Sequence, residues 1–409
     1  MLSIKDVYKI GKGPSSSHTM GPNRAAKIFA KRFPSADKVE VILYGSLAKT
    51  GRGHHTDYAV TDGLKPIDVE IKFDKTTPAS ELPHENTMKF IAYKDGEQIG
   101  EMTALSIGGG DIQIAGENIN RDERQVYTES SFAEIAEYCM HHEMRLSDFV
   151  YQKEGESIKE YLGKVWDTML DSIHRGLSTQ GILEGGLGVE RKAYTLFSSR
   201  HIDESASTKE NRLVCAYAFA VGEENAQFGT VVTAPTCGSC SVVPAVMKYE
   251  SELRHVKRDK IIDGLAVGGL IGNIIKTNAS ISGAECGCQA EMGSACSMAS
   301  AALCEMLDMG ILQIEYAAEV ALEHQLGLTC DPVCGLVQIP CIERGAVSAM
   351  RAINCMSLAN FLSSSRKISF DMLVDTMYRT GKDISSRYRE TSEGGLAESY
   401  DTGKYMLIK

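Results

Sequence analysis

The chain has 409 residues, a formal net charge of −11 and twelve cysteines. This length can bury two or three hydrophobic cores without disulfides, and the acidic balance without a long basic stripe argues against nucleic-acid binding. The first ten residues lack the apolar core of a secretion signal, and the most apolar run, 264–275, is too short to span a bilayer. We therefore expect a cytoplasmic protein that acts on a small molecule.

Residues 1 to about 116 alternate between strand-like and helical patterns. The runs 39–44, 67–73 and 88–93 are expected to be strands, and helices are expected at 23–32 and 57–64. The strict alternation of 67–73 predicts a sheet with one face covered and the other in solvent. These patterns predict an α/β, sandwich-like domain that we place at residues 1–153.

From about residue 130 the periodicity becomes helical and stays so to the end of the chain. Segments 134–144 and 158–178 are amphipathic, and 264–275 is expected to be a buried core helix. Small residues dominate 283–309, which lets helices approach closely. We predict a larger all-α domain at residues 154–409 and assign the whole chain to the α+β class.

A hydroxyl-rich loop precedes the first expected helix. Gly-Pro-Ser-Ser-Ser-His-Thr-Met-Gly-Pro at 13–22 supplies side-chain donors and free backbone N–H groups suited to an anion such as a carboxylate. The candidate residues are Ser15, Ser16, Ser17, His18 and Thr19. The alternative is that one serine only caps the helix.

A second loop, Thr-Gly-Arg-Gly-His-His-Thr-Asp at 50–57, places two histidines and a carboxylate at a bend after a strand. Histidine is the usual proton carrier near neutral pH, and Asp57 could orient His54 or His55. The alternative is a solvent-facing histidine loop with Asp57 as a helix cap.

The cysteines form groups that predict metal binding more strongly than disulfides in a reducing compartment. Cys330, Cys334 and Cys341 lie in a segment with two prolines, which we expect to be a stiff loop. Cys286 and Cys288 flank a glycine upstream. Three separated thiolates around a cubane iron–sulfur centre would leave one iron open to substrate oxygens.

The remaining thiols have simpler interpretations. The CxxC pair Cys237 and Cys240 could be half of a zinc site or a redox pair, but the second pair of a zinc ribbon is absent from the sequence. The others are expected to be core residues, namely Cys139, Cys215, Cys296, Cys304 and Cys355.

Several motifs together resemble the bacterial iron–sulfur L-serine dehydratases (L-serine ammonia-lyases). They are the two loops above, Ser-Ile-Gly-Gly-Gly at 106–110, Glu-Glu-Asn-Ala at 223–226, Val-Thr-Ala-Pro-Thr at 232–236, and the segment from Leu-Gly-Leu-Thr-Cys-Asp-Pro-Val to Ile-Pro-Cys-Ile-Glu-Arg at 326–344. The likeness covers residues 4 to about 397, with a β-type region before an α-type region in one chain. A homodimer is expected.

The resemblance implies conversion of L-serine to pyruvate and ammonia, with a [4Fe-4S] cluster on Cys288, Cys330 and Cys341. It also implies that His54 removes the α-proton, with His55 as the weaker candidate. Ser15, Ser16, Ser17 and His18 would hold the substrate carboxylate. Further substrate-binding candidates are Thr19, His55, Asp57, Lys276 and Asn278.

Two departures from the family pattern leave open questions. Cys237, Cys240 and Cys334 stand where the family has other residues, so they could serve as a temporary fourth cluster ligand or only fill space.

A related lyase acting on L-cysteine or L-threonine, and a non-catalytic iron–sulfur sensor, remain alternatives. A pyridoxal phosphate enzyme is disfavoured because it would leave the cysteine grouping unexplained.

Overall fold

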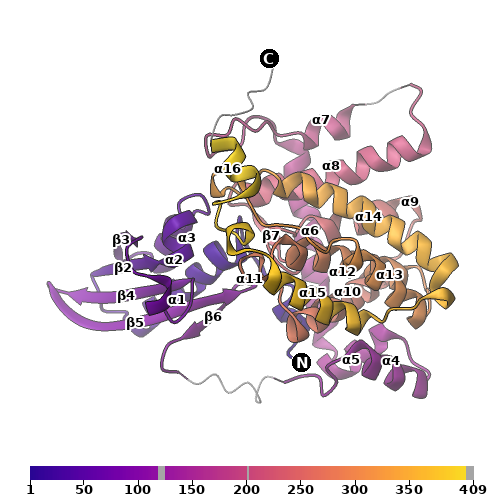
Figure 1. The fold of residues 1–409 in the computed structure, drawn as a ribbon, viewed down its shortest axis with the longest axis horizontal. Coiled ribbons are helices and arrows are strands. Elements are labelled where there is room, and N and C mark those ends of the chain that lie inside the picture. Colours follow the sequence, from indigo (N-terminus) through magenta and orange to yellow (C-terminus); the bar gives the residue numbers. More distant parts are fainter. Residues whose placement is uncertain (118–124, 200–201, 402–409) are drawn as a thin grey trace.

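The computed structural model describes residues 1–117, 125–199 and 202–401. A layer containing the main sheet lies beside a larger helical body (Figure 1). The α+β class predicted from the sequence is confirmed.

The main sheet is mixed, with strand order β3-β2-β4-β5-β6. Strands β2 and β3 are parallel, and the other neighbours are antiparallel. The strands are β2 (Lys38–Tyr44), β3 (Asp68–Asp74), β4 (Thr87–Lys94), β5 (Glu97–Gly108) and β6 (Asp111–Ile114). The three strands predicted from the sequence agree with β2, β3 and β4 to within one residue at each end.

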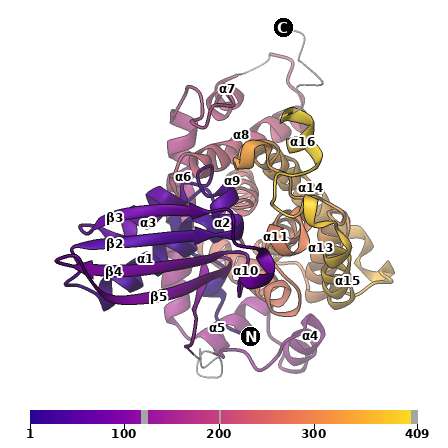
Figure 2. The same ribbon diagram turned by 60° about the vertical axis from the view of Figure 1, so that its left-hand side comes forward.

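Helices α1 (Gly21–Arg32) and α3 (Thr56–Leu64) pack against one face of this sheet. Alternate residues of β2 are buried beneath them because side chains of a strand point to opposite faces. Phe29 of α1 stacks on Phe90 of β4 with their ring centroids 5.2 Å apart. Figure 2 shows the sheet with the short helix α2 (Gly45–Thr50) at its end toward the helical body.

The helical body is built around α10 and α12. All thirteen residues of α12 are buried. Gly264 of α10 has no room for a side chain, because a Cβ there would lie 2.7 Å from the Ala302 carbonyl oxygen. The body contains α4 (Phe132–His141), α5 (Leu146–Glu154), α6 (Ser157–Ser178), α7 (Ala193–Ser198), α8 (Ala206–Ala226), α9 (Val242–Leu253), α10 (Arg258–Asn278), α11 (Gly283–Cys286), α12 (Ser294–Met306), α13 (Ile311–Glu323), α14 (Cys341–Leu362), α15 (Phe370–Asp383) and α16 (Gly395–Asp401).

No helix in the described ranges is both long enough and apolar enough to cross a lipid bilayer. The buried thiols of Cys139, Cys296, Cys304 and Cys355 lie in the large core, as predicted, and Cys215 is half-buried at its edge.

The first twelve residues pack mainly on the helical body, and Lys9 also bonds Asp111 at the edge of the main sheet. Ile4, Val7 and Tyr8 belong to the large core, and β1 (Ile10–Lys12) pairs with β7 (Thr230–Val232). Gly269 on α10 makes room for this arm, because a Cβ there would lie 2.8 Å from the Tyr8 ring. The domain division at residue 153 stays a prediction, and the large core also takes in residues from Tyr127 to Val150.

Candidate active site

The hydroxyl-rich loop forms a short π-helical turn, η2 (Ser16–Met20), immediately before α1. Ser15 is extended, and its Oγ accepts a hydrogen bond from the His18 backbone N–H at 3.1 Å. The hydroxyl of Thr19 donates to the carbonyl of His54 at 2.7 Å and so joins this turn to the histidine loop. All five candidate residues of the turn, Ser15 to Thr19, are buried.

Both parts of the fold hold this turn in place. Three side chains donate to its carbonyl oxygens: Asn225 of α8 to Pro14 at 2.9 Å, Ser106 of β5 to Ser17 at 2.6 Å, and Thr56 of α3 to His18 at 2.6 Å. The turn therefore lies at the seam between the main-sheet layer and the helical body.

The His18 imidazole is hydrogen-bonded at both ring nitrogens. Nδ1 lies 2.9 Å from Ser17 Oγ, and Nε2 lies 2.9 Å from Ser46 Oγ at the start of α2. A Glu390 carboxylate oxygen is 3.9 Å from Nδ1. Burial, and then the neighbouring His54, hold the pKa of His18 well below its usual range, so the ring is neutral.

His54 differs from His18 in its hydrogen bonding. It is fully buried with its ring centroid 4.5 Å from that of His18. Neither His54 ring nitrogen meets hydrogen-bond geometry with a described residue, and the nearby Thr50 backbone acts on the pKa of the ring in the direction opposite to burial. Burial is the main cause that lowers the pKa of His54 to about 4. A neutral imidazole accepts a proton at its unprotonated nitrogen. Because the protein offers the buried His54 ring no hydrogen-bonded partner, the ring is suited to a proton from a bound substrate.

The histidine loop meets the cysteine-bearing loop of the helical body. A Cβ on Gly53 would lie 3.0 Å from the Gly335 carbonyl oxygen and 3.4 Å from that of Cys334. A side chain at this position would be tightly packed against the backbone, so glycine favours the close approach of the two loops. The residue before His54 therefore contacts the segment between Cys330 and Cys341.

Three thiols predicted as ligands come from three segments. Cys288 precedes the short turn η5 (Gln289–Gly293), Cys330 pairs through its backbone with residues 388–390, and Cys341 begins α14. Between Cys330 and Cys341 the only helical piece is η6 (Val333–Gly335), a 3-10 turn. This irregular geometry agrees with the stiff loop predicted from the prolines.

The three thiols are close enough to affect one another. Burial raises the pKa of each of them, that of Cys288 to about 12. Cys288 and Cys341 both add to the rise at Cys330. Arg344 opposes the rise because its guanidinium hydrogen-bonds Cys288 and attracts a negative charge on Cys341. A bound cation would favour the thiolate forms in the same way.

Three cysteine thiols from separate segments are the type of ligand that an iron–sulfur cluster takes. Within the described parts of the chain, no three His, Cys, Asp or Glu side chains converge closely enough to hold one metal ion. A cubane cluster takes thiolates on its outer corners, which spreads its ligands. Gly283 leaves room beside Cys330, because a Cβ there would lie 2.9 Å from the Cys330 sulfur.

Two half-buried carboxyls and a guanidinium lie close to the thiols, and sequence reasoning missed all three. Glu291 accepts a hydrogen bond from Thr236 Oγ1 at 2.7 Å, and burial raises its pKa. Burial and the nearby Glu291 raise the pKa of Glu390. Glu291 stands three residues after Cys288, and Arg344 three after Cys341, which is the only sequence pattern that could have found them. Glu390 has none.

Other predicted substrate contacts are engaged elsewhere. The Lys276 ammonium lies 2.7 Å from the Asp111 carboxylate, and Asn278 donates to the Ser130 carbonyl at 2.6 Å. Asp57 accepts from the Tyr58 backbone N–H at 3.0 Å. The His55 ring packs against Tyr58 and Phe228. The structure thus groups Ser15 to Thr19 with His54. The hydrogen bonds, ion pair and ring contacts named above direct these four side chains elsewhere, although His55 also lowers the pKa of the adjacent His54.

The CxxC segment lies next to Glu291. Cys237 and Cys240 are buried, and burial is the largest cause that raises the pKa of both thiols. A Cβ on Gly238 would lie 3.2 Å from a Glu291 carboxylate oxygen. Buried thiols with raised pKa values are poor nucleophiles, which disfavours a redox pair.

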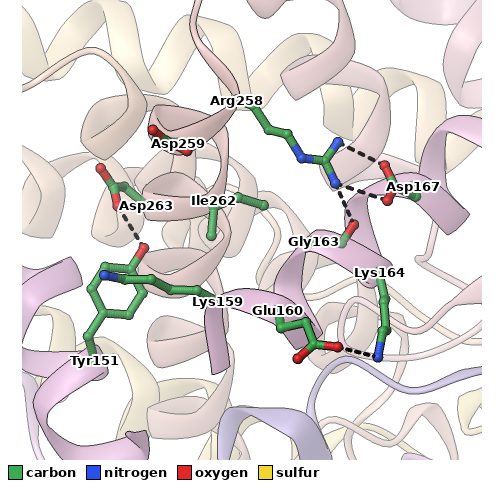
Figure 3. A pocket seen from close by; sticks show the side chains of 10 residues that line it. All are labelled: Tyr151, Lys159, Glu160, Gly163, Lys164, Asp167, Arg258, Asp259, Ile262 and Asp263. Carbon is green, nitrogen blue, oxygen red and sulfur yellow. Dashed lines mark hydrogen bonds and ion pairs between the residues drawn. The ribbon is translucent and has the colours of Figure 1, made fainter. Parts of the chain in front are cut away.

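Several charged groups of a pocket elsewhere on the molecule pair with one another. This cavity of about 650 Å³ lies between α5, α6 and α10 (Figure 3). Arg258 forms two hydrogen bonds to Asp167, and the Tyr151 hydroxyl donates to Asp263 at 2.6 Å. None of the candidate active-site residues lines it.

Comparison with known proteins identifies the family of this chain. A family model described as "Serine dehydratase alpha chain" matches residues 113–397, and one described as "Serine dehydratase beta chain" matches residues 3–77. The chain belongs to the serine dehydratase family. It therefore carries the β-type region before the α-type region in one polypeptide, as the motifs predicted.

Similarity to curated members of this family extends over nearly the whole chain. "L-serine dehydratase 2" of Escherichia coli is 40% identical, with 97% of this chain and 98% of the relative covered. "L-serine dehydratase" of Haemophilus influenzae is 39% identical, with 97% and 99% covered. "L-serine dehydratase" of Streptomyces coelicolor is 38% identical, with 97% and 98% covered.

Proposed function

We propose that this chain is an L-serine ammonia-lyase that eliminates water from L-serine to give pyruvate and ammonia. Family membership supports the reaction class. The observation that carries the assignment of roles is the buried His54 imidazole, which has two unpartnered nitrogens beside a serine-rich turn. A base without a partner in the protein is suited to a C–H group of a bound substrate.

The substrate carboxylate is proposed to bind at the turn. The hydroxyls of Ser15, Ser16 and Ser17 are donors on one short segment, and the neutral His18 ring adds a further polar group. Once the carboxylate is fixed there, the α-carbon faces the adjacent His54 ring, whose free nitrogen accepts the α-proton. Fixing both groups in one geometry lowers the entropic part of the barrier.

Cys288, Cys330 and Cys341 are proposed to hold a [4Fe-4S] cluster. An iron without a protein thiolate is a Lewis acid that can polarise a substrate hydroxyl, which is otherwise a poor leaving group. The side chains of Glu291, Glu390 and Arg344 surround the thiols and set the local charge. The close approach of Gly53 to Gly335 supports this proposal, because it brings the His54 loop against the segment between Cys330 and Cys341.

Anaerobic purification with iron and sulfide quantitation, followed by a pyruvate assay, tests the proposal. The expected result is about four irons per chain, pyruvate formation from L-serine, and loss of activity after exposure to air. Turnover of L-threonine and L-cysteine measured side by side establishes the preferred substrate. A colourless, iron-poor protein that still deaminates L-serine would contradict the cluster, and a stable cluster without turnover would favour a sensor.

A further inference from the structure

A pocket of about 300 Å³ opens at the seam, beside the candidate active site. One side of it is formed by the start of α2 and by residues 74–78, and the other by residues 389–391. The latter segment pairs with Cys330 through its backbone. In Figure 1 the yellow C-terminal segment that leads to α16 runs between the sheet and the helical body. The pocket thus lies where the two parts of the fold meet.

Two side chains that line this pocket also contact the His18 ring. Ser46 Oγ lies 2.9 Å from Nε2, and a Glu390 oxygen lies 3.9 Å from Nδ1. His18 itself is fully buried. These two side chains therefore separate the imidazole from the pocket.

The position of Ser46 is fixed by its backbone. Its N–H donates to the Glu85 carbonyl at 2.9 Å, and its own carbonyl accepts from the Thr50 hydroxyl at 3.0 Å. Gly45 before it has a φ of +54°, and a Cβ there would lie 2.3 Å from the Glu85 carbonyl oxygen. Only glycine suits that residue, so the chain places the Ser46 hydroxyl at one defined point.

We propose that Ser46 is a positioning residue that holds the His18 ring in the active site and shields its Nε2 from the seam pocket. The proposal rests on the role of His18 in holding the substrate carboxylate. Ser17 binds the other ring nitrogen, so the ring is fixed by one hydroxyl at each end. Removal of the Ser46 hydroxyl takes away the side-chain partner of Nε2 and leaves only the Ser46 backbone beside the ring, so the ring is freer to turn about its bond to Cβ.

Steady-state kinetics of the anaerobic holoenzyme test the effect on substrate binding. Ser46→Ala is expected to raise KM for L-serine about fivefold, as the loss of one hydrogen bond implies, with kcat within about twofold. Ser46→Thr keeps the hydroxyl, and its added methyl can enter the pocket, so it is expected to behave like the parent. Thr76→Ala is the matched control, because Thr76 lines the same pocket but bonds Asp74. An unchanged KM in Ser46→Ala, or equal losses in Ser46→Thr, would overturn the proposal.

Modification by diethyl pyrocarbonate supplies a readout that does not depend on turnover. The rate at which the His18 peptide is labelled, followed by mass spectrometry, is expected to rise at least threefold in Ser46→Ala and to stay unchanged in Ser46→Thr and Thr76→Ala. Labelling of His174 on α6 serves as the internal reference. If the alanine variant does not fold, Ser46→Cys, a weaker hydrogen-bond partner, takes its place with a smaller rise expected.

Equal labelling of His18 in the parent and in Ser46→Ala would overturn the shielding role. A parent enzyme that does not turn over L-serine would instead remove the proposed function, and the labelling would still decide whether Ser46 shields His18.

Discussion

The imidazole rings of His18 and His54 lie 4.5 Å apart, yet one is hydrogen-bonded at both nitrogens and the other at neither. Both are buried and both have lowered pKa values. A ring whose nitrogens are occupied is held in place, whereas an unoccupied ring can accept a proton. This difference is the basis of our proposal that His18 positions the substrate and His54 acts as the base.

Replacement of His54 is expected to abolish most activity without loss of iron. His54→Gln should lower kcat by roughly 10²- to 10⁴-fold, the usual effect of removing a general base. His55→Gln separates the two neighbours, and His142→Gln is a control on a remote histidine. The measurement is pyruvate formation together with iron content per chain. A larger loss in His55→Gln than in His54→Gln would transfer the base role to His55.

Acid is expected to destabilise the protein through the same residue. The pKa of His54 is about 4 in the folded protein, below its ordinary value of 6.5, so the unfolded chain binds the extra proton first. The contribution of His54 to the free energy of unfolding is therefore fully present above pH 6.5. It decreases as the pH drops toward 4, by about 3 kcal/mol in total. His18 acts in the same direction.

The thermal unfolding midpoint measured from pH 7 to pH 5 tests this expectation. His54→Gln removes one titrating group, so its midpoint should decline less steeply than that of the parent. Parallel declines in the two proteins would show that other groups control acid stability.

Each thiol proposed as a ligand should be needed for iron binding. Cys330→Ser is expected to reduce iron and acid-labile sulfide to near background, whereas Cys215→Ser, a half-buried thiol on α8, should not. Gly283→Ala should also lower iron content, because its Cβ would lie 2.9 Å from the Cys330 sulfur. Gly163→Ala on α6 is the matched glycine control. Full iron content in Cys330→Ser would remove that residue from the ligand set.

The Asp111 carboxylate is expected to stabilise the contact between the main sheet and the helical body. It accepts ion pairs from Lys9 at 2.6 Å, Lys276 at 2.7 Å and Arg24 at 3.2 Å. Asp111→Asn leaves these cations without their shared partner and should lower the free energy of unfolding by about 2 kcal/mol. Glu70→Gln, which breaks an exposed pair with Lys38, is the control.

A double-mutant cycle with Lys276 separates this structural role from substrate binding. If Lys276 acts through Asp111, the combined loss of stability in Asp111→Asn with Lys276→Met is smaller than the sum of the single losses. A selective rise in KM for Lys276→Met, without loss of stability, would instead support the substrate contact predicted from the sequence.

The Cys237 side chain is expected to contribute only to core packing. Cys237→Ala should retain the iron content and visible spectrum of the parent, and should lower stability by about 1 kcal/mol because it removes a buried sulfur. A changed spectrum without substrate would favour its role as a temporary cluster ligand.

Local patterns in the sequence determined much of the fold. The alternation in 67–73 and the helical periodicity of 158–178 correspond to β3 and α6 within one residue at each end. The loops bearing His54 and Cys330 were identified because glycine, proline, histidine and cysteine have chemical and conformational properties that do not depend on distant residues.

Only the tertiary structure decided which of these residues meet. Lys276 and Asp57 looked like substrate contacts in the sequence but are engaged by Asp111 and the Tyr58 backbone. Glu390 approaches His18 across 372 positions of the chain, and the unpartnered state of His54 depends on every element packed around it. Burial and long-range contacts are properties of the folded chain as a whole, so no local pattern of residues encodes them.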